Sequence, residues 1–492
     1  MPSRLFRSHL ARTSTPAIAS VRASVCTSIC AALTVTAMVV SSATAGASPA
    51  SLSAESPAAE SLAVSGGVSN AIGIDGVGNS ACTQRMQKAL TSVLQASGVN
   101  SFGGIVHSAG NSVVGNSAKP VWQSNADRAL APASITKLLT ASAALHTLQP
   151  TKRQETGVYL AIDGSLVLRG TGDVTLSRRA TAPTFYTNAA RISDLAQQVS
   201  HKVKYLPIKP KRLIVDTSFY TGPDMARGWD RWDIGGGSIA PIVPAMLDGG
   251  RIHDAGWYSP HTPTPSLQVG ATLAQYLGID GLKIEVGKPP LALLPLGKVH
   301  SAPLRDRLHD MLIHSDNVLA ESIGREVASE MGHPASFRGA ADAVIATVGS
   351  HNVPTRGAVL EDTSGLSSYD RLAPRTIEET LRPHNLSEKR DVTDIIRDNL
   401  PVAGESGTLR YRFGGENAAA RGHIRAKTGS LNNVSTLAGI AYSARSNTPY
   451  YFAFLVNDTV YWLATMLVDN LAATVYRLSL IHISEPTRRT PI

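Results

Sequence analysis

A serine and a lysine three residues apart are the first residues in this sequence with the right types and spacing for chemistry. Ser134-Ile135-Thr136-Lys137 comes shortly after Pro132, and the apolar residues that follow recur at helical spacing. Residues three apart share one face of a helix, so the Lys137 amine can reach the Ser134 hydroxyl. A serine hydroxyl is a weak nucleophile at neutral pH unless a base takes its proton. We therefore predict that Ser134 is an acyl-forming nucleophile and that Lys137 is its base.

This pair works only if the amine of Lys137 is neutral. A lysine with an ordinary pKa of about 10.4 is protonated at neutral pH, so its pKa must be lowered by burial or by a nearby cation. A position in the first helical turn would also stabilise the developing alkoxide of Ser134 through the helix dipole. The four-residue pattern alone is a weak signal, because Ser and Lys are common residues.

Two further segments could complete a site. Ser315-Asp316-Asn317 lies between two predicted helices, and Lys427-Thr428-Gly429-Ser430 ends a predicted strand. Taken singly, the first reads as a helix N-cap and the second as a strand end with a turn glycine. The three segments together, in this order, are the signature of the penicillin-recognising serine enzymes.

That signature implies a role for each residue. Lys427 would be a cation that helps to lower the pKa of Lys137, and Ser315 would pass a proton between the base and the leaving group. Asn317 would hold the peptide amide of the substrate.

The strand segment would bind the rest of the reacting end. Thr428 and Lys427 would bind the terminal carboxylate, beside Gly429. Backbone N–H groups of Ser134 and Ser430 would form the oxyanion hole. This chemistry needs no metal and no cofactor.

Several more segments widen the resemblance. From about Ser101 to Val475 the chain resembles the class C low-molecular-mass penicillin-binding proteins, the D-Ala-D-Ala carboxypeptidase/endopeptidase family. The matching segments are Gly170 to Leu176 (GTGDVTL), Gly228-Trp229, Ala240-Pro241, Asp362 to Ser367 (DTSGLS) and Pro401 to Leu409 (PVAGESGTL). The resemblance implies a serine-type D-Ala-D-Ala carboxypeptidase acting on peptidoglycan stem peptides and acylated by β-lactams. Endopeptidase action on crosslinks would use the same machinery, so both activities stay open.

The resemblance also implies a recognition residue. In this family an Asp five residues after the Gly of Gly-Trp binds the distal amine of the stem peptide's diaminopimelate, and that position here is Asp233. The alternative is that Asp233 is an ordinary loop residue before Gly235. Where relatives carry Arg after Ser-Gly-Leu-Ser, this chain has Ser368, so recognition of the substrate side chain is expected to differ.

Two other functions remain as alternatives. A β-lactamase would turn over a chromogenic cephalosporin rapidly, whereas a carboxypeptidase would stay acylated. A non-catalytic β-lactam sensor or wall-binding protein on the same fold would release no D-Ala. A sensor would need a transmembrane signalling segment, and the sequence after residue 50 has no such segment.

The surrounding elements predict an α+β fold. Helical spacing appears around Met86 to Leu94, after Ser134 and near the end, from Tyr461 to Tyr476. Three more helices are expected after Pro303, at Leu304 to Ile313, Asn317 to Met331 and Gly339 to Val348. Strand-like runs are expected at 104–106, 121–123, 158–160, 166–168 and 213–215, and an antiparallel meander at 424–427, 435–442 and 450–456. This layout predicts a penicillin-binding/β-lactamase-like transpeptidase domain, an antiparallel sheet flanked by helices, with an inserted β-rich domain.

The chain divides into five predicted parts. Residues 1–45 are a predicted signal peptide, with basic residues, an apolar stretch and Ala43-Thr44-Ala45 as a cleavage site; an uncleaved membrane anchor is the alternative. A Ser/Ala/Gly-rich linker is expected at 46–80. The catalytic domain would comprise 81–150 and 300–477, interrupted by an inserted domain at 151–299. The tail at 478–492 matches nothing before it and is interpreted as a sequence artefact.

Composition limits the partners. Of the 492 residues, 43% are hydrophobic and 17% are charged, as in a folded globular protein. The net charge of +9 includes four arginines in the predicted signal peptide, and no dense basic tract with interleaved aromatics is present. We therefore expect no nucleic-acid partner and at most peripheral membrane association. The predicted location is secreted or extracytoplasmic, in the cell wall or periplasm.

Overall fold

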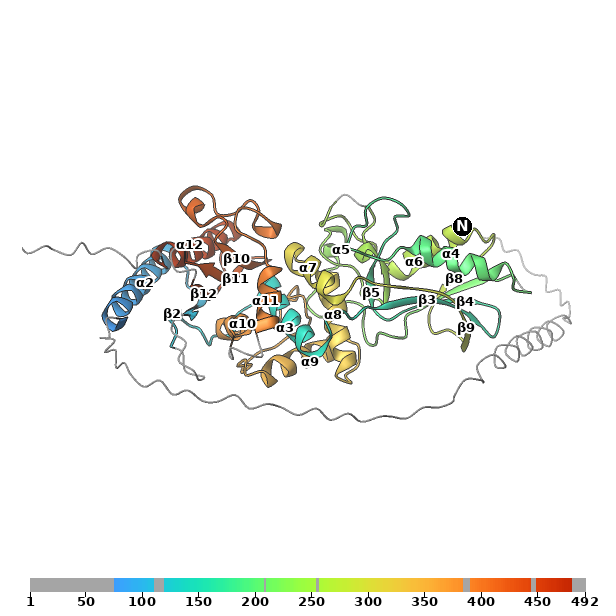
Figure 1. The fold of residues 1–492 in the computed structure, drawn as a ribbon, viewed down its shortest axis with the longest axis horizontal. Coiled ribbons are helices and arrows are strands. Elements are labelled where there is room, and N and C mark those ends of the chain that lie inside the picture. Colours follow the sequence, from blue (N-terminus) through green and yellow to red (C-terminus); the bar gives the residue numbers. More distant parts are fainter. Residues whose placement is uncertain are drawn as a thin grey trace, which may run out of the picture.

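The fold was examined in a computed structural model, which describes residues 75–109, 119–207, 209–253, 256–383, 390–443 and 448–479. The predicted signal peptide, nearly all of the predicted linker and most of the predicted tail lie outside these residues. The described part forms two bodies side by side along the long axis of the molecule (Figure 1). One body is built around an antiparallel sheet and the other around a mixed sheet.

The first sheet is entirely antiparallel and runs in the order β10-β11-β12-β1-β2. The meander predicted from the last third of the sequence forms three of these strands, and the two short runs near residues 104 and 122 form the others. The strands are β1 (Phe102–Ser108), β2 (Trp122–Ser124), β10 (Ile424–Leu431), β11 (Val434–Tyr442) and β12 (Pro449–Val456).

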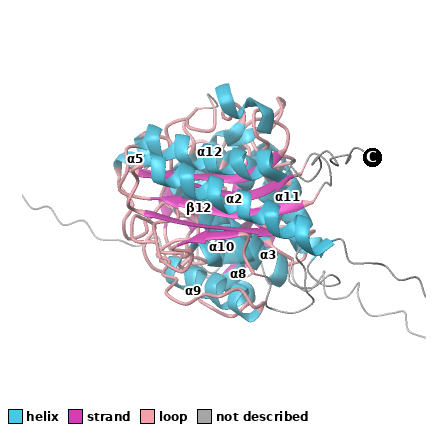
Figure 2. Cartoon of the chain, turned by 90° about the vertical axis from the view of Figure 1, so that its left-hand side faces the viewer, coloured by secondary structure: helices cyan, strands magenta, loops and turns pink. Residues whose placement is uncertain are grey.

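Helices cover both faces of this sheet (Figure 2). On one face α2 (Asp75–Ser97) and α12 (Tyr461–Ser479) pack together against apolar strand residues. On the other face lies a helical group, which includes the helices predicted after residues 134 and 303. It consists of α3 (Lys137–Thr147), α7 (Leu304–His314), α8 (Asn317–Glu330), α9 (Phe337–Ser350), α10 (Pro374–Leu381) and α11 (Arg390–Asp398). Short 3₁₀ turns accompany them: η2 (Ala133–Thr136), η4 (Gly407–Leu409) and η5 (Gly415–Ala420).

The second sheet lies within residues 155–300 and runs in the order β8-β6-β4-β3-β9. Its strands are β3 (Glu155–Ala161), β4 (Leu166–Gly170), β6 (Arg212–Asp216), β8 (Lys283–Val286) and β9 (Ala292–His300). The pairs β4·β6 and β6·β8 are parallel, whereas β3 pairs antiparallel with β4 and β9. A two-stranded pair, β5 (Asp173–Leu176) with β7 (Ala245–Leu247), and the short elements α5 (Trp232–Gly235) and η3 (Asp248–Gly250) lie nearer the first body.

Two helices of this region were not predicted. α4 (Ile192–Val203) and α6 (Pro265–Leu277) pack on the second sheet and share its apolar core. The boundaries of α6 follow from local chemistry, because Pro265 fits the first helical turn and Gly278 ends the helix in the left-handed conformation at φ 60°. The inserted region is therefore a sheet with helices, richer in helix than the sequence indicated.

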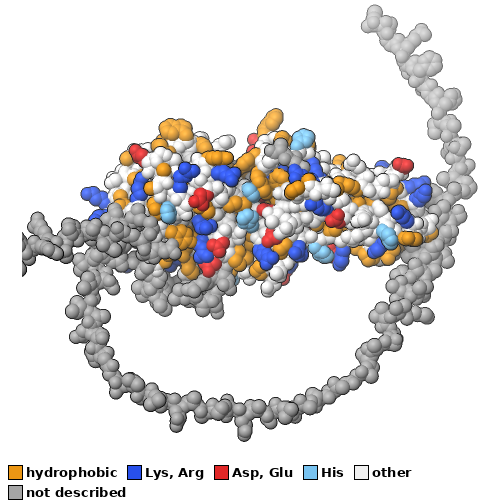
Figure 3. Space-filling model, turned by 45° about the horizontal axis from the view of Figure 1, so that its top comes forward, with side chains coloured by type: hydrophobic (Ala, Val, Ile, Leu, Met, Phe, Trp, Pro, Cys, Tyr) orange, Lys and Arg blue, Asp and Glu red, His pale blue; other side chains and the backbone are white. Residues whose placement is uncertain are grey.

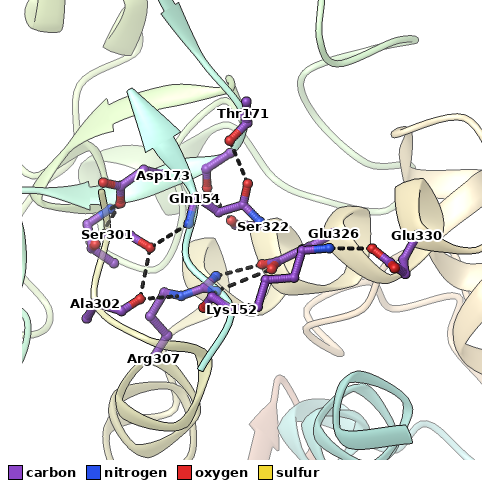
Figure 4. A network of polar contacts seen from close by, with 12 residues as sticks. Lys152, Gln154, Thr171, Asp173, Ser301, Ala302, Arg307, Ser322, Glu326 and Glu330 are labelled. Carbon is purple, nitrogen blue, oxygen red and sulfur yellow. Dashed lines mark hydrogen bonds and ion pairs between the residues drawn. The ribbon is translucent and has the colours of Figure 1, made fainter. Parts of the chain in front are cut away.

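A buried polar network joins the two bodies where the chain leaves and re-enters the first one (Figure 4). The guanidinium of Arg307 on α7 donates to Glu326 on α8 at 2.7 Å and to the carbonyl of Ala302 at 3.1 Å. The Ser301 hydroxyl accepts from the backbone N–H of Gln154 at 2.9 Å, beside the first strand of the inserted region. Both crossings of the chain are thus tied to the same pair of helices.

The GTGDVTL segment has a structural role at this junction. The carbonyl of Gly172 accepts a hydrogen bond from Ser322 on α8 at 2.6 Å, and the carboxylate of Asp173 accepts from the backbone N–H of Thr175 at 2.8 Å. Asp173 therefore organises the turn.

The surface carries both signs of charge. Basic and acidic side chains are interspersed over the face shown in Figure 3, without a continuous tract of one sign there. Among the described residues, no helix combines the length and apolar character that crossing a lipid bilayer requires.

Candidate active site

Ser134 lies in the tight turn that precedes α3, and Lys137 is the first residue of that helix. The sequence predicted a first α-helical turn, but η2 (Ala133–Thr136) is a 3₁₀ segment, and α3 begins at Lys137. In a 3₁₀ helix the side chains of residues three apart eclipse one another, so those of Ser134 and Lys137 lie on the same side of the turn. The Lys137 Nζ to Ser134 Oγ distance is 3.0 Å.

The backbone before Ser134 is strained. Ala133 has a φ of 51°, in a region that residues with a side chain seldom adopt, and the Thr436 hydroxyl fixes the turn by donating to the carbonyl of Pro132 at 2.8 Å. Gly429 on β10 packs against the same turn, since an added Cβ would lie 2.8 Å from the Pro132 carbonyl oxygen and 3.0 Å from the Ala133 Cβ. Close packing of β10 against η2 therefore requires glycine in the third segment.

Three acceptors surround the amine of Lys137. Besides Ser134 Oγ, they are Asn317 Oδ1 at 2.6 Å and the carbonyl oxygen of Ser364 at 2.7 Å. A neutral amine has two N–H donors and one lone pair. When the two oxygens of Asn317 and Ser364 accept those N–H groups, the lone pair is left for the hydroxyl hydrogen of Ser134. The arrangement suits general-base catalysis.

Burial makes the neutral form of Lys137 accessible. The side chain is 0% exposed, and desolvation lowers its pKa from 10.5 to about 8. Four carboxylates oppose this effect and hold the pKa up: Asp362, Glu321, Asp316 and Asp370. The sequence left burial and a neighbouring cation as possible causes of a lowered pKa, and burial is the largest cause.

Lys427 and Ser315 form a second hydrogen-bonded pair in the same site. Lys427 Nζ donates to Ser315 Oγ at 2.8 Å and to the Thr428 carbonyl at 2.8 Å. Lys427 is also 0% exposed, and burial together with repulsion from Lys137 lowers its pKa well below the ordinary value. The repulsion between the two amines thus acts on Lys427.

The Ser315-Asp316-Asn317 segment is shaped by its aspartate. Ser315 adopts the left-handed conformation at φ 63° between α7 and α8, and Asp316 caps α8 by accepting from the N–H of Leu319 at 2.8 Å. The other carboxylate oxygen of Asp316 accepts from Arg251 at 2.8 Å and from the Tyr186 hydroxyl at 2.8 Å. The capping role and the catalytic signature therefore coexist. Neither Arg251 nor Tyr186 was predicted from the sequence.

The loop from Asp362 to Ser367, one of the segments that carries the family resemblance, supplies the third acceptor of Lys137. The carboxylate of Asp362 accepts four hydrogen bonds, of 2.6 to 3.0 Å, from the backbone N–H groups of Ser364, Gly365 and Ser367 and from the indole N–H of Trp229. These bonds hold the loop so that the Ser364 carbonyl faces Lys137 Nζ. A backbone carbonyl has no signature in residue type, so sequence reasoning missed this contact.

The three predicted segments meet at one cleft of about 650 Å³. Ser134, Ser315, Asn317, Thr428 and Ser430 line it, and the buried amines of Lys137 and Lys427 contact this lining. Thr428 is bonded at 2.8 Å to Thr408, from the PVAGESGTL segment. The outer wall of the cleft carries aromatic and basic side chains that the sequence did not indicate: Trp257, Tyr258, His314, Arg410, Tyr411 and Tyr461.

Asp233 lies apart from this group. Its side chain is half-buried on α5, and the described residues that line the cleft do not include it. Its backbone carbonyl accepts from Ser238 N at 2.9 Å, and the carbonyl of Ser238 accepts from Asn317 Nδ2 at 2.9 Å. Burial and then the charge of Asp230 raise the pKa of Asp233. Ser368 is exposed.

One group in the described part of the chain has the donor types of a metal site. His107, Glu378 and Glu379 are buried and lie close together. His107 Nδ1 lies 2.9 Å from Glu378, and Arg382 pairs with both carboxylates. The guanidinium of Arg382 and the imidazole of His107 already pair with the carboxylates, so we interpret this group as a buried ion-pair cluster.

Comparison with known proteins shows what this chain resembles in family and fold. The model of the D-Ala-D-Ala carboxypeptidase 3 (S13) family matches residues 86–262 and 259–465. A carboxypeptidase of Mycobacterium tuberculosis is 41% identical over 344 residues, covering 69% of this chain and 73% of the relative. Carboxypeptidase DacB of Mycolicibacterium smegmatis is 42% identical over 354 residues, covering 69% of this chain and 74% of the relative.

The fold has a solved counterpart. The crystal structure of penicillin binding protein 4 (DacB) from Haemophilus influenzae matches with a TM-score of 0.63 at 21% identity, over 79% of this chain and 98% of that chain. This likeness confirms the predicted fold class. The family match spans all three segments that meet in the cleft. By the extent of that match and by its curated relatives, the chain belongs to the D-Ala-D-Ala carboxypeptidase 3 (S13) family.

Proposed function

We propose that this enzyme is a serine D-Ala-D-Ala carboxypeptidase of peptidoglycan stem peptides in which Ser134 forms the acyl-enzyme and Lys137 is the base. The observation that carries the proposal is the contact of 3.0 Å between Ser134 Oγ and the fully buried amine of Lys137. A buried lysine with a pKa of about 8 has an appreciable neutral fraction near neutral pH. That fraction can accept the hydroxyl proton.

Acylation proceeds in two steps, formation and collapse of a tetrahedral intermediate. Ser134 Oγ attacks the carbonyl carbon of the penultimate D-Ala while its proton passes to the lone pair of Lys137. Backbone N–H groups of Ser134 and Ser430 stabilise the oxyanion. The intermediate then collapses: the C–N bond breaks, and the terminal D-Ala leaves after its nitrogen receives a proton.

The pair of Ser315 and Lys427 suits the proton delivery to that nitrogen. The Ser315 hydroxyl accepts from Lys427 at 2.8 Å, which leaves the hydroxyl hydrogen of Ser315 free to point into the cleft. The proton that Lys137 took from Ser134 passes through this hydroxyl to the nitrogen, so Lys137 is neutral again. Water then attacks the ester carbonyl while Lys137 takes one of its protons. Lys137 returns that proton to Ser134 Oγ as the ester C–O bond breaks. The products are the shortened stem peptide and a regenerated Ser134 hydroxyl.

Substrate binding follows from the cleft lining. Asn317 holds the peptide amide, and its orientation is fixed because Nδ2 donates to Ser238 while Oδ1 faces Lys137. Thr428 with Lys427 binds the terminal carboxylate, and Gly429 allows β10 to approach Ser134. β-Lactams enter by the same route and acylate Ser134.

Asp233 is proposed as the partner of the stem peptide's distal amine. Its carboxylate has a raised pKa because it is partly buried beside Asp230, and an incoming ammonium would favour the charged form. Since Asp233 lies beyond the cleft lining, a long side chain of the substrate would have to reach past Ser238. Asp233→Asn should then raise KM for an amine-bearing stem peptide and leave KM for an acetylated one unchanged.

The test compares Ser134→Ala with wild type in two assays, namely release of D-Ala from a stem pentapeptide and intact-mass mapping of a penicillin adduct. We expect turnover to fall on the order of a million-fold and the adduct to disappear. Ser193→Ala, on α4 outside the cleft, serves as the control and should retain both. An adduct that persists on Ser134→Ala, or D-Ala release that is unchanged, would contradict the proposal.

The same assays separate the alternatives. Rapid hydrolysis of a chromogenic cephalosporin with no stable adduct would indicate a β-lactamase. Acylation without D-Ala release or crosslink cleavage would indicate a sensor. Cleavage of a crosslinked dimer would add endopeptidase action.

We further propose that the chain acts outside the cytoplasmic membrane after removal of residues 1–45, and that residues 81–150 with 300–477 form the catalytic domain around the insertion at 151–299. N-terminal sequencing of the protein recovered from the cell envelope would test the first part. An intact Met1 there would contradict cleavage.

A further inference from the structure

The two fixed acceptors of the Lys137 amine come from separate segments, and each segment contains a buried aspartate. Asn317 follows Asp316 at the start of α8, and Ser364 lies two residues after Asp362. Asp316 is 5% exposed and Asp362 is 0% exposed. The positions of the two acceptors therefore depend on what holds these two carboxylates.

Side chains from residues 151–299 hold both of them. Arg251 and Tyr186 each donate to Asp316 at 2.8 Å, and Arg251 also donates to the hydroxyl of Tyr186 at 2.8 Å. Trp229 donates its indole N–H to Asp362 at 2.7 Å. The guanidinium of Arg251 is itself fixed by the aromatic rings of Phe185, Tyr186 and Trp257, at 4.5 to 5.6 Å.

We propose that the inserted region positions the general base: Trp229 and Arg251, acting through Asp362 and Asp316, fix the two oxygens that orient the Lys137 lone pair toward Ser134. This inference rests on the proposed function. The neutral amine can rotate about its last C–N bond, so only acceptors in fixed places select the orientation in which the lone pair meets the Ser134 hydroxyl. Each acceptor is held from the other body of the molecule.

The same region also contacts the substrate space. Ser238, Trp257 and Tyr258 line the cleft, and Trp257 provides both a wall of the cleft and one ring around Arg251. Binding energy from a substrate that contacts this wall can therefore be used to hold the base in place. The inserted region would thus contribute to kcat as well as to KM.

Trp229→Phe tests the contact between Trp229 and Asp362, because it keeps an aromatic ring and removes only the N–H donor. We expect the rate of Ser134 acylation by labelled penicillin to fall on the order of tenfold or more, since misplaced catalytic groups have large effects on rate. The matched control is Trp122→Phe, which removes an indole N–H that donates to Thr91 at 3.1 Å on the far side of the first sheet. Trp122→Phe should acylate at the wild-type rate.

A double-mutant cycle distinguishes positioning from general damage. If Trp229 acts through Asp362, then Trp229→Phe should slow acylation in the wild-type background and have little further effect in Asp362→Asn. Asp362→Asn should also shift the acid limb of the pH–rate profile to lower pH. It removes a carboxylate that holds the pKa of Lys137 up, while Glu321, Asp316, Asp370 and Lys427 still face that amine.

Tyr186→Phe tests the contact with Asp316. If Asp362→Asn does not fold, this variant decides whether the inserted region positions Lys137. It removes one donor to Asp316 and should slow acylation severalfold. Wild-type rates in both Trp229→Phe and Tyr186→Phe, or an effect of Trp229→Phe that persists in Asp362→Asn, would overturn the inference. Failure of the proposed function would look different, because wild type itself would then form no adduct on Ser134.

Discussion

The inserted region has exposed ion pairs on its outer sheet and a buried ion pair at its boundary, where it contacts the first body. On the outer sheet Arg212 pairs with Asp163 while both side chains remain 42% and 36% exposed. At the boundary Arg251 pairs with Asp316, and their side chains are only 3% and 1% exposed. This pair lies close to the fully buried amines of Lys137 and Lys427. Water screens the first pair, so it contributes little to stability. The second pair is desolvated, so it decides geometry and protonation.

This contrast predicts that the two ends of the inserted region tolerate substitutions differently. The outer sheet is stabilised by its apolar core between strands and helices. The boundary contributes side chains to a network that ends at Ser134. Loss of a boundary residue should therefore affect catalysis as well as stability, whereas loss of an outer ion pair should affect neither appreciably.

The largest expected effect comes from the centre of the network. Lys137→Met should slow acylation by about 100- to 10,000-fold, the usual range for a general base. The free energy of unfolding should be kept or increased, because a buried amine is replaced by an apolar side chain of similar length. Acylation kinetics and thermal unfolding measure the two effects. Lys202→Met on α4, which removes an exposed amine bonded to the Pro295 carbonyl, is the control and should change neither.

The next effect lies at the boundary itself. Arg251→Met leaves Asp316 buried without its cation, so we expect the free energy of unfolding to fall by about 3–5 kcal/mol. Arg169→Met breaks the pair with Asp216 on the outer sheet, where the arginine side chain is 44% exposed, and should cost about 1 kcal/mol or less. Equal losses in the two variants, measured by denaturant unfolding, would remove the distinction between the two ends of the region.

A smaller effect concerns acid. His261 is buried beside Arg251, and burial followed by that cation lowers its pKa from 6.5 to about 4. As the pH falls, His261 is protonated near pH 6.5 in the unfolded chain. In the folded chain it is protonated only near pH 4. The free energy of unfolding must therefore fall as the pH falls through this window.

His261→Gln should flatten this dependence by about 2–3 kcal/mol between pH 6.5 and 4, as measured by unfolding at each pH. His201→Gln, at an exposed position on α4, should follow the wild-type curve. A His261→Gln curve that also follows wild type would show that the boundary histidine does not titrate differently in the two states.

Sequence reasoning predicted what residue types and local spacing encode. Ser134 with Lys137, Ser315 with Asn317, and Lys427 with Thr428 could be picked out because each pair is close in sequence, and the structure brings the three segments to one cleft. Most helix and strand positions followed from apolar periodicity. The 3₁₀ form of the turn at Ser134 did not, because i to i+3 spacing fits both helix types.

The rest depends on contacts between distant residues. The Ser364 carbonyl is a backbone atom that any residue type would provide. Arg251 and Trp229 lie 65 and 133 residues from the aspartates they hold. Arg251 has no local pattern around it, and the Gly228-Trp229 match does not indicate that Trp229 contacts Asp362. The sequence named burial and a nearby cation as possible causes of a lowered Lys137 pKa, and it could not choose between them because burial is a property of the packed core. The helix α6 could have been found, since Pro265 and Gly278 mark its ends.

The central claim is that a buried, neutral Lys137 activates Ser134, and the rate of Ser134 acylation by penicillin as a function of pH tests it most directly. Because the amine must lose its proton to act, the rate should rise through a single ionisation near pH 8 and level off above it. A rate that is constant from pH 6 to 10, or that falls as the pH rises through 8, would contradict this account.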